Sequence, residues 1–223
     1  MSAPRRPGRP GAGDPSSPNG STPSSAAAAT LREAKAELRT ALRLRRTVRT
    51  PAERARADAG RFAALTDLFT PALDRLGMVA AYLSRPEEPD TLELVAWLAA
   101  YQVPTLLPVL TADGPDWALY SGPDHVRLGP HQVPEPTGRP LGPTALAAAG
   151  VIICPGLAAS RTGARLGQGV GWYDRALEHA RPDAVIAVLL DDDEVLGSIP
   201  VEPHDRPMDL VITGSQVITR SIG

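Results

Sequence analysis

The stretch that decides the fold is residues 151–190, which read VIICPGLAASRTGARLGQGVGWYDRALEHARPDAVIAVLL. The apolar runs 151–154 and 184–190 predict two buried strands, and the spacing of apolar residues over 172–181 predicts a helix between them. Two strands joined through a helix lie parallel in one sheet, because this connection is too long for a hairpin. We therefore expect a parallel sheet built around this unit.

The same alternation continues before and after this stretch. Short apolar runs predict strands at 78–83, 104–110 and 209–213, and a hairpin of 117–120 with 125–128, followed by a Pro/Gly-rich loop at 129–143. Helices are expected at 30–48, at 50–69 and from 90 to about 101, and the last two open with the capping-box patterns TPAE and DTLE. The alternation predicts one α/β domain over residues 28–223, with a mostly parallel sheet, helices on both faces and a three-layer, Rossmann-like arrangement. Ligands of such sheets bind at the carboxyl ends of the strands.

Residues 1–27 consist mainly of proline, glycine, serine, alanine and arginine. They have no large apolar side chain after Met1, so they cannot offset the entropy lost on ordering, and we interpret them as a disordered N-terminal tail. A solvated tail is the simpler interpretation, and contact of its arginines with an anionic surface is the alternative.

Composition narrows the class of protein. The chain has 223 residues, 43% apolar and 22% charged, with a net charge of −2 and one cysteine, Cys154. No apolar stretch reaches the roughly 20 residues that span a bilayer, and the first residues lack the apolar core of a secretory signal. A single cysteine excludes an internal disulfide framework and a cysteine-based zinc site. We expect a cytoplasmic monomer with no membrane or nucleic-acid partner.

Residues 156–171 form a long, glycine-rich connection between a predicted strand and a predicted helix. Gly167, Gly169 and Gly171 alternate along it, so backbone N–H groups can turn toward an anion, and Arg165 and the helix N-terminus add positive charge. This combination suits phosphate oxygens. The segment is neither a P-loop, since no Gly-Lys-Ser/Thr follows, nor a G-x-G-x-x-G loop, since its third glycine comes one residue early. A purely structural turn is the alternative.

Two further features extend this hypothesis. Lys35 is the only lysine in a chain that has 22 arginines. It shares a helix face with Arg39, four residues later. Asp174 stands in the first turn of the helix after the glycine-rich loop, where a carboxylate is either a Mg²⁺ ligand or a partner of the helix dipole. Asp205, in a proline-rich segment, is a second candidate for the same ion. The histidines are scattered and predict no zinc site, and the acidic run 191–194 is interpreted as a solvated turn.

Several groups of residues, in the right order, resemble the 5-formyltetrahydrofolate cyclo-ligase family, also called 5,10-methenyltetrahydrofolate synthetase. Residues 155–177, PGLAASRTGARLGQGVGWYDRAL, are similar to the family pattern P-G-L-A-F-D-x-x-G-x-R-L-G-x-G-x-G-Y-Y-D-R. The other matches are KAELR at 35–39, YLS at 82–84 with EPDT at 88–91, Glu135-Pro136, and IPVEPHD at 199–205. The resemblance extends from about residue 31 to residue 213.

The resemblance implies an enzyme that uses ATP and Mg²⁺ to convert 5-formyltetrahydrofolate into 5,10-methenyltetrahydrofolate, through phosphorylation of the formyl oxygen. It implies catalytic roles for Arg165 and Tyr173, and Mg²⁺ binding by Asp174 and Asp205. The implied folate-binding residues are Glu88, Trp172 and Tyr173. The implied ATP-binding residues are Lys35, Arg39, Arg165, Leu166, Gly167, Gln168, Gly169, Val170, Gly171, Trp172 and Tyr173.

The chain departs from the family pattern inside the loop. Ala159-Ser160 replaces Phe-Asp, Gln168 replaces a Tyr or Arg, Val170 replaces a Gly or Lys, and Trp172 replaces the first Tyr. Because a β-branched residue at position 170 would resist a positive φ, a diverged relative that binds nucleotide or folate without turnover is an alternative. A third hypothesis is a protein that binds anions or nucleic acid through the arginines of residues 5–49.

Overall fold

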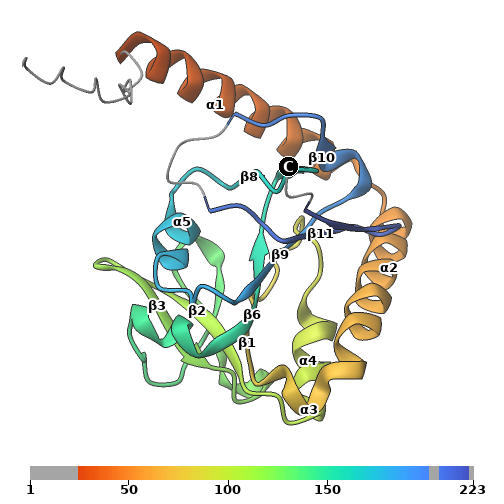
Figure 1. The fold of residues 1–223 in the computed structure, drawn as a ribbon, viewed down its shortest axis with the longest axis vertical. Helices are drawn as coiled ribbons and strands as arrows, with labels where there is room; N and C mark the ends of the chain where they lie inside the picture. Colours follow the sequence, from red (N-terminus) through yellow and green to blue (C-terminus); the bar gives the residue numbers. More distant parts are fainter. Residues whose placement is uncertain (1–24, 201–205, 221–223) are drawn as a thin grey trace, which may run out of the picture.

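A computed structural model of the chain describes residues 25–200 and 206–220 (Figure 1). Its helices are α1 (Ser25–Val48), α2 (Pro51–Phe69), η1 (Thr70–Ala72), α3 (Leu73–Leu76), α4 (Leu92–Ala100), η2 (Pro123–His125), η3 (Pro130–Gln132), η4 (Pro143–Ala148), α5 (Trp172–Leu177) and η5 (Asp192–Glu194). Its strands are β1 (Met78–Ala80), β2 (Thr105–Thr111), β3 (Gly114–Leu119), β4 (Val126–Leu128), β5 (Pro134–Pro136), β6 (Ala149–Pro155), β7 (Ala158–Ser160), β8 (Arg165–Leu166), β9 (Val185–Leu189), β10 (Val195–Leu196), β11 (Leu210–Ile212) and β12 (Val217–Thr219). Among these residues, no helix combines the length and apolar character needed to cross a membrane.

The core of the fold is a seven-stranded sheet in the order β12-β11-β9-β6-β1-β2-β3. Neighbouring strands from β11 to β2 pair in parallel, and β12 and β3 pair antiparallel at the two edges. The two strands predicted from residues 151–190 lie side by side, with Ile152 opposite Ile186 and Ile153 opposite Ala187. The predicted α/β class with a mostly parallel sheet is therefore confirmed.

Alternate residues of the central strands face opposite layers of helix. Ile152 belongs to an apolar cluster with Leu146 of η4 and Leu177 of α5, whereas its neighbour Ile153 packs with Leu65 of α2 and residues of α4. In Figure 1, α2 and α4 lie on one side of the sheet and α5 on the other. Because side chains alternate across a strand, a fully apolar run such as 151–154 indicates burial on both faces, as observed.

Only some of the predicted helix starts are confirmed. α1 begins at Ser25, so the last three residues of the predicted tail are helical, and residues 1–24 lie outside the described residues. At α2 the capping box is confirmed, since the Thr50 hydroxyl accepts from Glu53 N and the Glu53 carboxylate accepts from Thr50 N. The capping box predicted at 90–93 does not form: Asp90 Oδ1 accepts from Leu92 N at 3.1 Å, but the N-cap residue of α4 is Thr91, whose side chain makes no capping hydrogen bond.

Three loop and strand predictions are also wrong. The expected hairpin of 117–120 with 125–128 does not form: β3 pairs with β2, and β4 pairs with β5. Residues 129–143 are not a plain loop, since they include η3, β5 and the start of η4, and the loop 156–171 holds β7 and β8. Periodicity identifies a strand but not its partner, so the tertiary structure decided these pairings.

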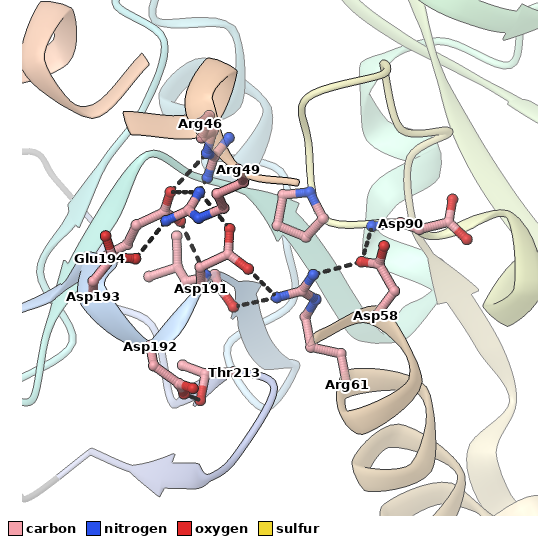
Figure 2. A network of polar contacts seen from close by, with 12 residues as sticks. Arg46, Arg49, Asp58, Arg61, Asp90, Asp191, Asp192, Asp193, Glu194 and Thr213 are labelled. Atoms are coloured by element: carbon pink, nitrogen blue, oxygen red, sulfur yellow. Dashed lines mark hydrogen bonds and ion pairs between the residues drawn. The ribbon is translucent and has the colours of Figure 1, made fainter. Parts of the chain in front are cut away.

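The acidic run 191–194 is only partly the predicted solvated turn, since Asp192 and Asp193 are exposed but Glu194 is buried. Glu194 is 0% exposed, and it accepts hydrogen bonds from Arg46 Nε at 2.7 Å and Arg49 Nη1 at 3.2 Å (Figure 2). Burial by itself lowers the pKa of Arg46, but the hydrogen bond and the negative charge of Glu194 outweigh it, so the pKa of Arg46 is raised. Ion pairs between α1 and this run therefore hold α1 against the rest of the domain.

At Gly60, α2 meets the turn between β11 and β12 without room for a side chain. A Cβ atom at Gly60 would stand 1.9 Å from the carbonyl oxygen of Gly214, and one at Gly214 would stand 2.8 Å from Ala57 Cα. Both distances are shorter than non-bonded contacts allow, so the close approach of helix and turn requires glycine on both sides.

Candidate active site

The principal pocket in the described part of the chain has a volume of about 910 Å³ and is bounded by α1, the loop 165–171 and the loop that carries Glu88. It lies where β1 and β6 end, since Tyr82 and Leu83 just after β1 and Pro155 at the end of β6 line it. This is the carboxyl edge of the parallel strands, where α/β sheets bind ligands.

The pocket brings together every predicted site residue that the structure describes. These are Lys35, Arg39, Glu88, Arg165, Leu166, Gly167, Gln168, Gly169, Val170, Gly171, Trp172, Tyr173 and Asp174. Asp205, the second predicted Mg²⁺ ligand, lies outside the described residues. Residues that are as far apart in sequence as Lys35 and Asp174 therefore line one cavity.

A row of basic residues on α1 faces the glycine-rich loop. Lys35 is 7% exposed, and Arg39, one turn later, donates from Nε to the carbonyl of Gly167 at 2.9 Å. Arg43 continues the row and donates to the backbone carbonyl of Gln168 at 2.8 Å. The sequence analysis missed Arg43, although its i+4 spacing from Arg39 was a usable signal.

The glycines of the loop adopt conformations that other residues resist. Gly169 has a φ of 101° and Gly171 a φ of 65°. A Cβ at Gly167 would stand 3.0 Å from Arg165 Nη1, and one at Gly169 would stand 3.2 Å from Arg39 Cζ, so both glycines leave room for guanidinium groups. Val170, which lies between Gly169 and Gly171, has no positive φ and is 71% exposed, so the strain expected from this substitution does not arise.

Arg165 lies at the centre of the pocket wall. Its Nη1 donates to the carbonyl of Pro155 at 3.1 Å, its Nη2 donates to Asp174 Oδ1 at 2.6 Å, and its Cζ lies 5.7 Å from the centre of the Tyr173 ring. The end of β6 and the first turn of α5 thus hold the guanidinium in one orientation.

The aromatic residues at the start of α5 present buried polar atoms. The ring centroids of Trp172 and Tyr173 lie 4.8 Å apart. Trp117 packs edge-on against Trp172, with 5.2 Å between their ring centroids. The Tyr173 hydroxyl and the Trp172 Nε1 are buried, with no hydrogen-bond partner in the described part of the chain. Burial raises the pKa of Tyr173 well above its usual value, so its hydroxyl remains a donor at neutral pH. Both side chains line the pocket, and both of these atoms are donors without an acceptor in the described residues.

Glu88 also lines the pocket and is held by contacts within its own loop. Arg85 Nη2 donates to Glu88 Oε1 at 2.8 Å, and Arg85 N donates to Oε2 at 3.0 Å. Gln168 Nε2 lies 3.5 Å from the same Oε1. Arg85 was not singled out in the sequence, and nothing in its local pattern distinguishes it from the other arginines.

The described residues include no cluster of three or more His, Cys, Asp and Glu side chains that could bind a metal ion. Asp174 is the one described member of the predicted Mg²⁺ pair. Mg²⁺ in nucleotide sites is commonly held by one or two carboxylates together with phosphate oxygens and water. A single carboxylate beside a basic pocket is compatible with that arrangement.

Comparison with known proteins yields one family. The profile of the "5-formyltetrahydrofolate cyclo-ligase family" matches residues 31–214. A 5-formyltetrahydrofolate cyclo-ligase of Mycolicibacterium smegmatis is 37% identical over 141 residues, 60% of this chain and 72% of that protein, and one of Escherichia coli is 30% identical over 79% of this chain and 98% of that protein. The solved 5,10-methenyltetrahydrofolate synthetase of Aquifex aeolicus superposes with a TM-score of 0.73 at 25% identity, over 85% of this chain and 94% of that one.

Proposed function

The chain belongs to the 5-formyltetrahydrofolate cyclo-ligase family, and we propose that it converts 5-formyltetrahydrofolate into 5,10-methenyltetrahydrofolate with hydrolysis of ATP to ADP and phosphate. One observation carries the proposal beyond family membership. Lys35, Arg39, Arg165 and Asp174, which suit a nucleotide, line the same pocket as Glu88, which suits the folate. A reaction between the two ligands requires this proximity.

The nucleotide phosphates are proposed to bind between α1 and the glycine-rich loop. Lys35, Arg39 and Arg165 supply positive charge there, and Gly167 and Gly169 leave space beside the two guanidinium groups. Phosphoryl transfer depends mainly on alignment and on neutralising the charge of the oxygens. Arg165 is held by the carbonyl of Pro155 and the carboxylate of Asp174. Its proposed role is to present a fixed positive charge to the phosphate oxygens during transfer.

The folate is proposed to bind between Glu88 and the aromatic pair of α5. A carboxylate accepts hydrogen bonds from the N–H edge of a pterin, and the rings of Trp172 and Tyr173 supply a flat apolar wall. The formyl oxygen attacks the γ-phosphorus as the bond to ADP breaks. N10 then attacks the activated carbon, loses its proton and displaces phosphate. The buried Tyr173 hydroxyl is proposed to donate to the reacting oxygen.

Mg²⁺ is proposed as the cation that accompanies ATP, and Asp174 would hold it. When bound, it would neutralise charge on the phosphate oxygens. Asp205 remains the proposed second ligand. The chain is also proposed to be a monomeric cytoplasmic protein with a three-layer, Rossmann-like fold.

The test is a spectroscopic assay for methenyl-folate formation with ATP, Mg²⁺ and 5-formyltetrahydrofolate. All three together should give product, and leaving out any one should abolish it. Binding of ATP and folate without product would overturn the enzyme and support a diverged binder. Measuring ADP in the same samples checks that one ATP is consumed for each product formed.

A further inference from the structure

A chain of buried and partly buried ion pairs connects α1, the acidic run 191–194 and α2 (Figure 2). It begins at Arg46 on α1 and passes through Glu194, Arg49 and Asp191 to Arg61 on α2. From Arg61 it continues to Asp58 and then to the backbone of Asp90. These contacts join three segments that are distant in sequence.

At its first end, the network holds the backbone beside the carbonyl that accepts from Arg165. Arg46 Nη2 donates to the carbonyl of Gly156 at 2.6 Å and to Glu194 Oε2 at 2.8 Å. The preceding carbonyl, that of Pro155, accepts from Arg165 Nη1. Arg46 and Arg165 therefore grip adjacent carbonyls at the end of β6, and Arg46 itself lines the pocket.

A second route connects Glu194 to the same place. Glu194 directly precedes β10, which pairs with β7 through Val195 and Ala159, and β7 pairs with β8, where Arg165 lies. Displacement of Glu194 would move this short sheet as well as Arg46. The first end of the network thus fixes the nucleotide half of the site.

At its other end, the network holds the loop that carries Glu88. Asp58 Oδ1 accepts from Asp90 N at 2.9 Å and from Arg61 Nη2. The Asp90 side chain in turn accepts from Ser84 Oγ at 2.8 Å, which ties the two ends of the 84–90 segment together. Glu88 lies inside this segment, so Asp58 fixes the folate half of the site.

From these contacts we infer that the network positions both halves of the site, with Arg46 and Glu194 aligning the nucleotide half and Asp58 the folate half. Stability alone is a poor explanation, because buried ion pairs are often no more stabilising than apolar side chains of the same size. Their directional hydrogen bonds instead fix backbone positions, and an active site needs its groups held closely in place. This role rests on the proposed function, since it assumes the two ligands assigned to the pocket.

The experiment measures the dissociation constants of ATP and of 5-formyltetrahydrofolate, each titrated alone, for wild type and three variants. Glu194→Gln removes the negative charge between Arg46 and Arg49. Arg46→Lys keeps a positive charge but loses the bidentate contact of Nε and Nη2 with the two Glu194 oxygens. Both should weaken ATP about tenfold and 5-formyltetrahydrofolate less than about threefold. Asp58→Asn should show the opposite pattern. Asp183→Asn, at an exposed ion pair with Arg181 outside the network, is the control.

Thermal unfolding of each variant shows whether a loss of binding comes from misfolding or from misaligned site residues. If Glu194→Gln does not fold, Arg46→Lys tests the nucleotide half in its place. Equal weakening of both ligands, or no weakening, in the folded variants overturns the positioning role and leaves the proposed function standing. A wild type that binds neither ligand overturns the proposed function itself. The crossed pattern supports the inference, because a general loss of stability would not discriminate between ligands.

Discussion

Arg165 on β8 donates from Nη2 to Oδ1 of Asp174, in the first turn of α5, at 2.6 Å. The Arg165 side chain is 6% exposed and that of Asp174 is 37% exposed, so the carboxylate forms the outer, accessible member of the pair. In the proposed site, a cation ligand and a phosphate ligand would thus stand next to each other, as is needed to hold a nucleotide with its metal ion.

Asp174→Asn tests this relationship. The amide keeps the size of the side chain but loses the negative charge, so half-maximal activity should require about tenfold more Mg²⁺ or higher. Titration of Mg²⁺ at saturating ATP measures the effect. Asp67→Asn, an exposed position on α2, is the matched control. An unchanged Mg²⁺ requirement would leave Asp174 only the task of orienting Arg165.

Lys35→Ala tests the basic row on α1. Loss of a charged hydrogen-bond donor costs about 1.5–3 kcal/mol, which corresponds to roughly 10- to 150-fold weaker ATP binding. Lys35→Arg should recover only part of the loss, because the guanidinium keeps the charge but is larger and planar. ATP titration by calorimetry decides the matter, with Arg45→Ala as the exposed control on the same helix. Equal dissociation constants for wild type and Lys35→Ala would remove Lys35 from the site.

Glu88→Gln tests the folate half. The amide still accepts one hydrogen bond but no longer offers a charge, so the KM for 5-formyltetrahydrofolate should rise about tenfold or more while the KM for ATP stays nearly constant. Steady-state kinetics with each substrate varied in turn gives both values. Glu93→Gln, exposed on α4, controls for the loss of one negative charge. A parallel rise in both KM values would contradict the assignment.

Alkaline pH should destabilise the protein. Burial raises the pKa of Cys154 from 9.0 to about 12, and it raises the pKa values of Tyr82 and Tyr173 well above 10.0. The unfolded chain therefore releases these protons first as pH rises above about 9, and each group lowers the free energy of unfolding by up to about 1.4 kcal/mol per pH unit. Denaturant unfolding between pH 8 and 11 measures the slope, which should be shallower in Cys154→Ala. A flat profile would show that these groups titrate normally.

The sequence predicted the parallel centre of the sheet better than its edges. The runs that became β6 and β9 are apolar at every position, and full burial leaves such a run few alternatives. β3 and β4 are only partly buried, and the expected hairpin between them failed because their partners are β2 and β5. Local pattern does not specify the partner of a short strand.

The site was predictable where its residues lie in one motif and unpredictable where they act across the fold. The loop from Arg165 to Asp174 carries its own signal in the glycine spacing. Glu194 carries none, because its burial depends on Arg46, which is 148 residues away. An acidic run is solvated unless the tertiary structure supplies cations, and the sequence around it does not show whether that happens.

The contact between Gly60 and Gly214 has a consequence for engineering. A glycine inside a helix such as α2 is an obvious target for stabilisation, since alanine usually gains about 1 kcal/mol there. Here the added methyl group would stand 1.9 Å from a carbonyl oxygen. An alanine introduced at this position by consensus design or helix optimisation would therefore push α2 away from the β11–β12 turn. Arg61, the next residue on α2, would move with it.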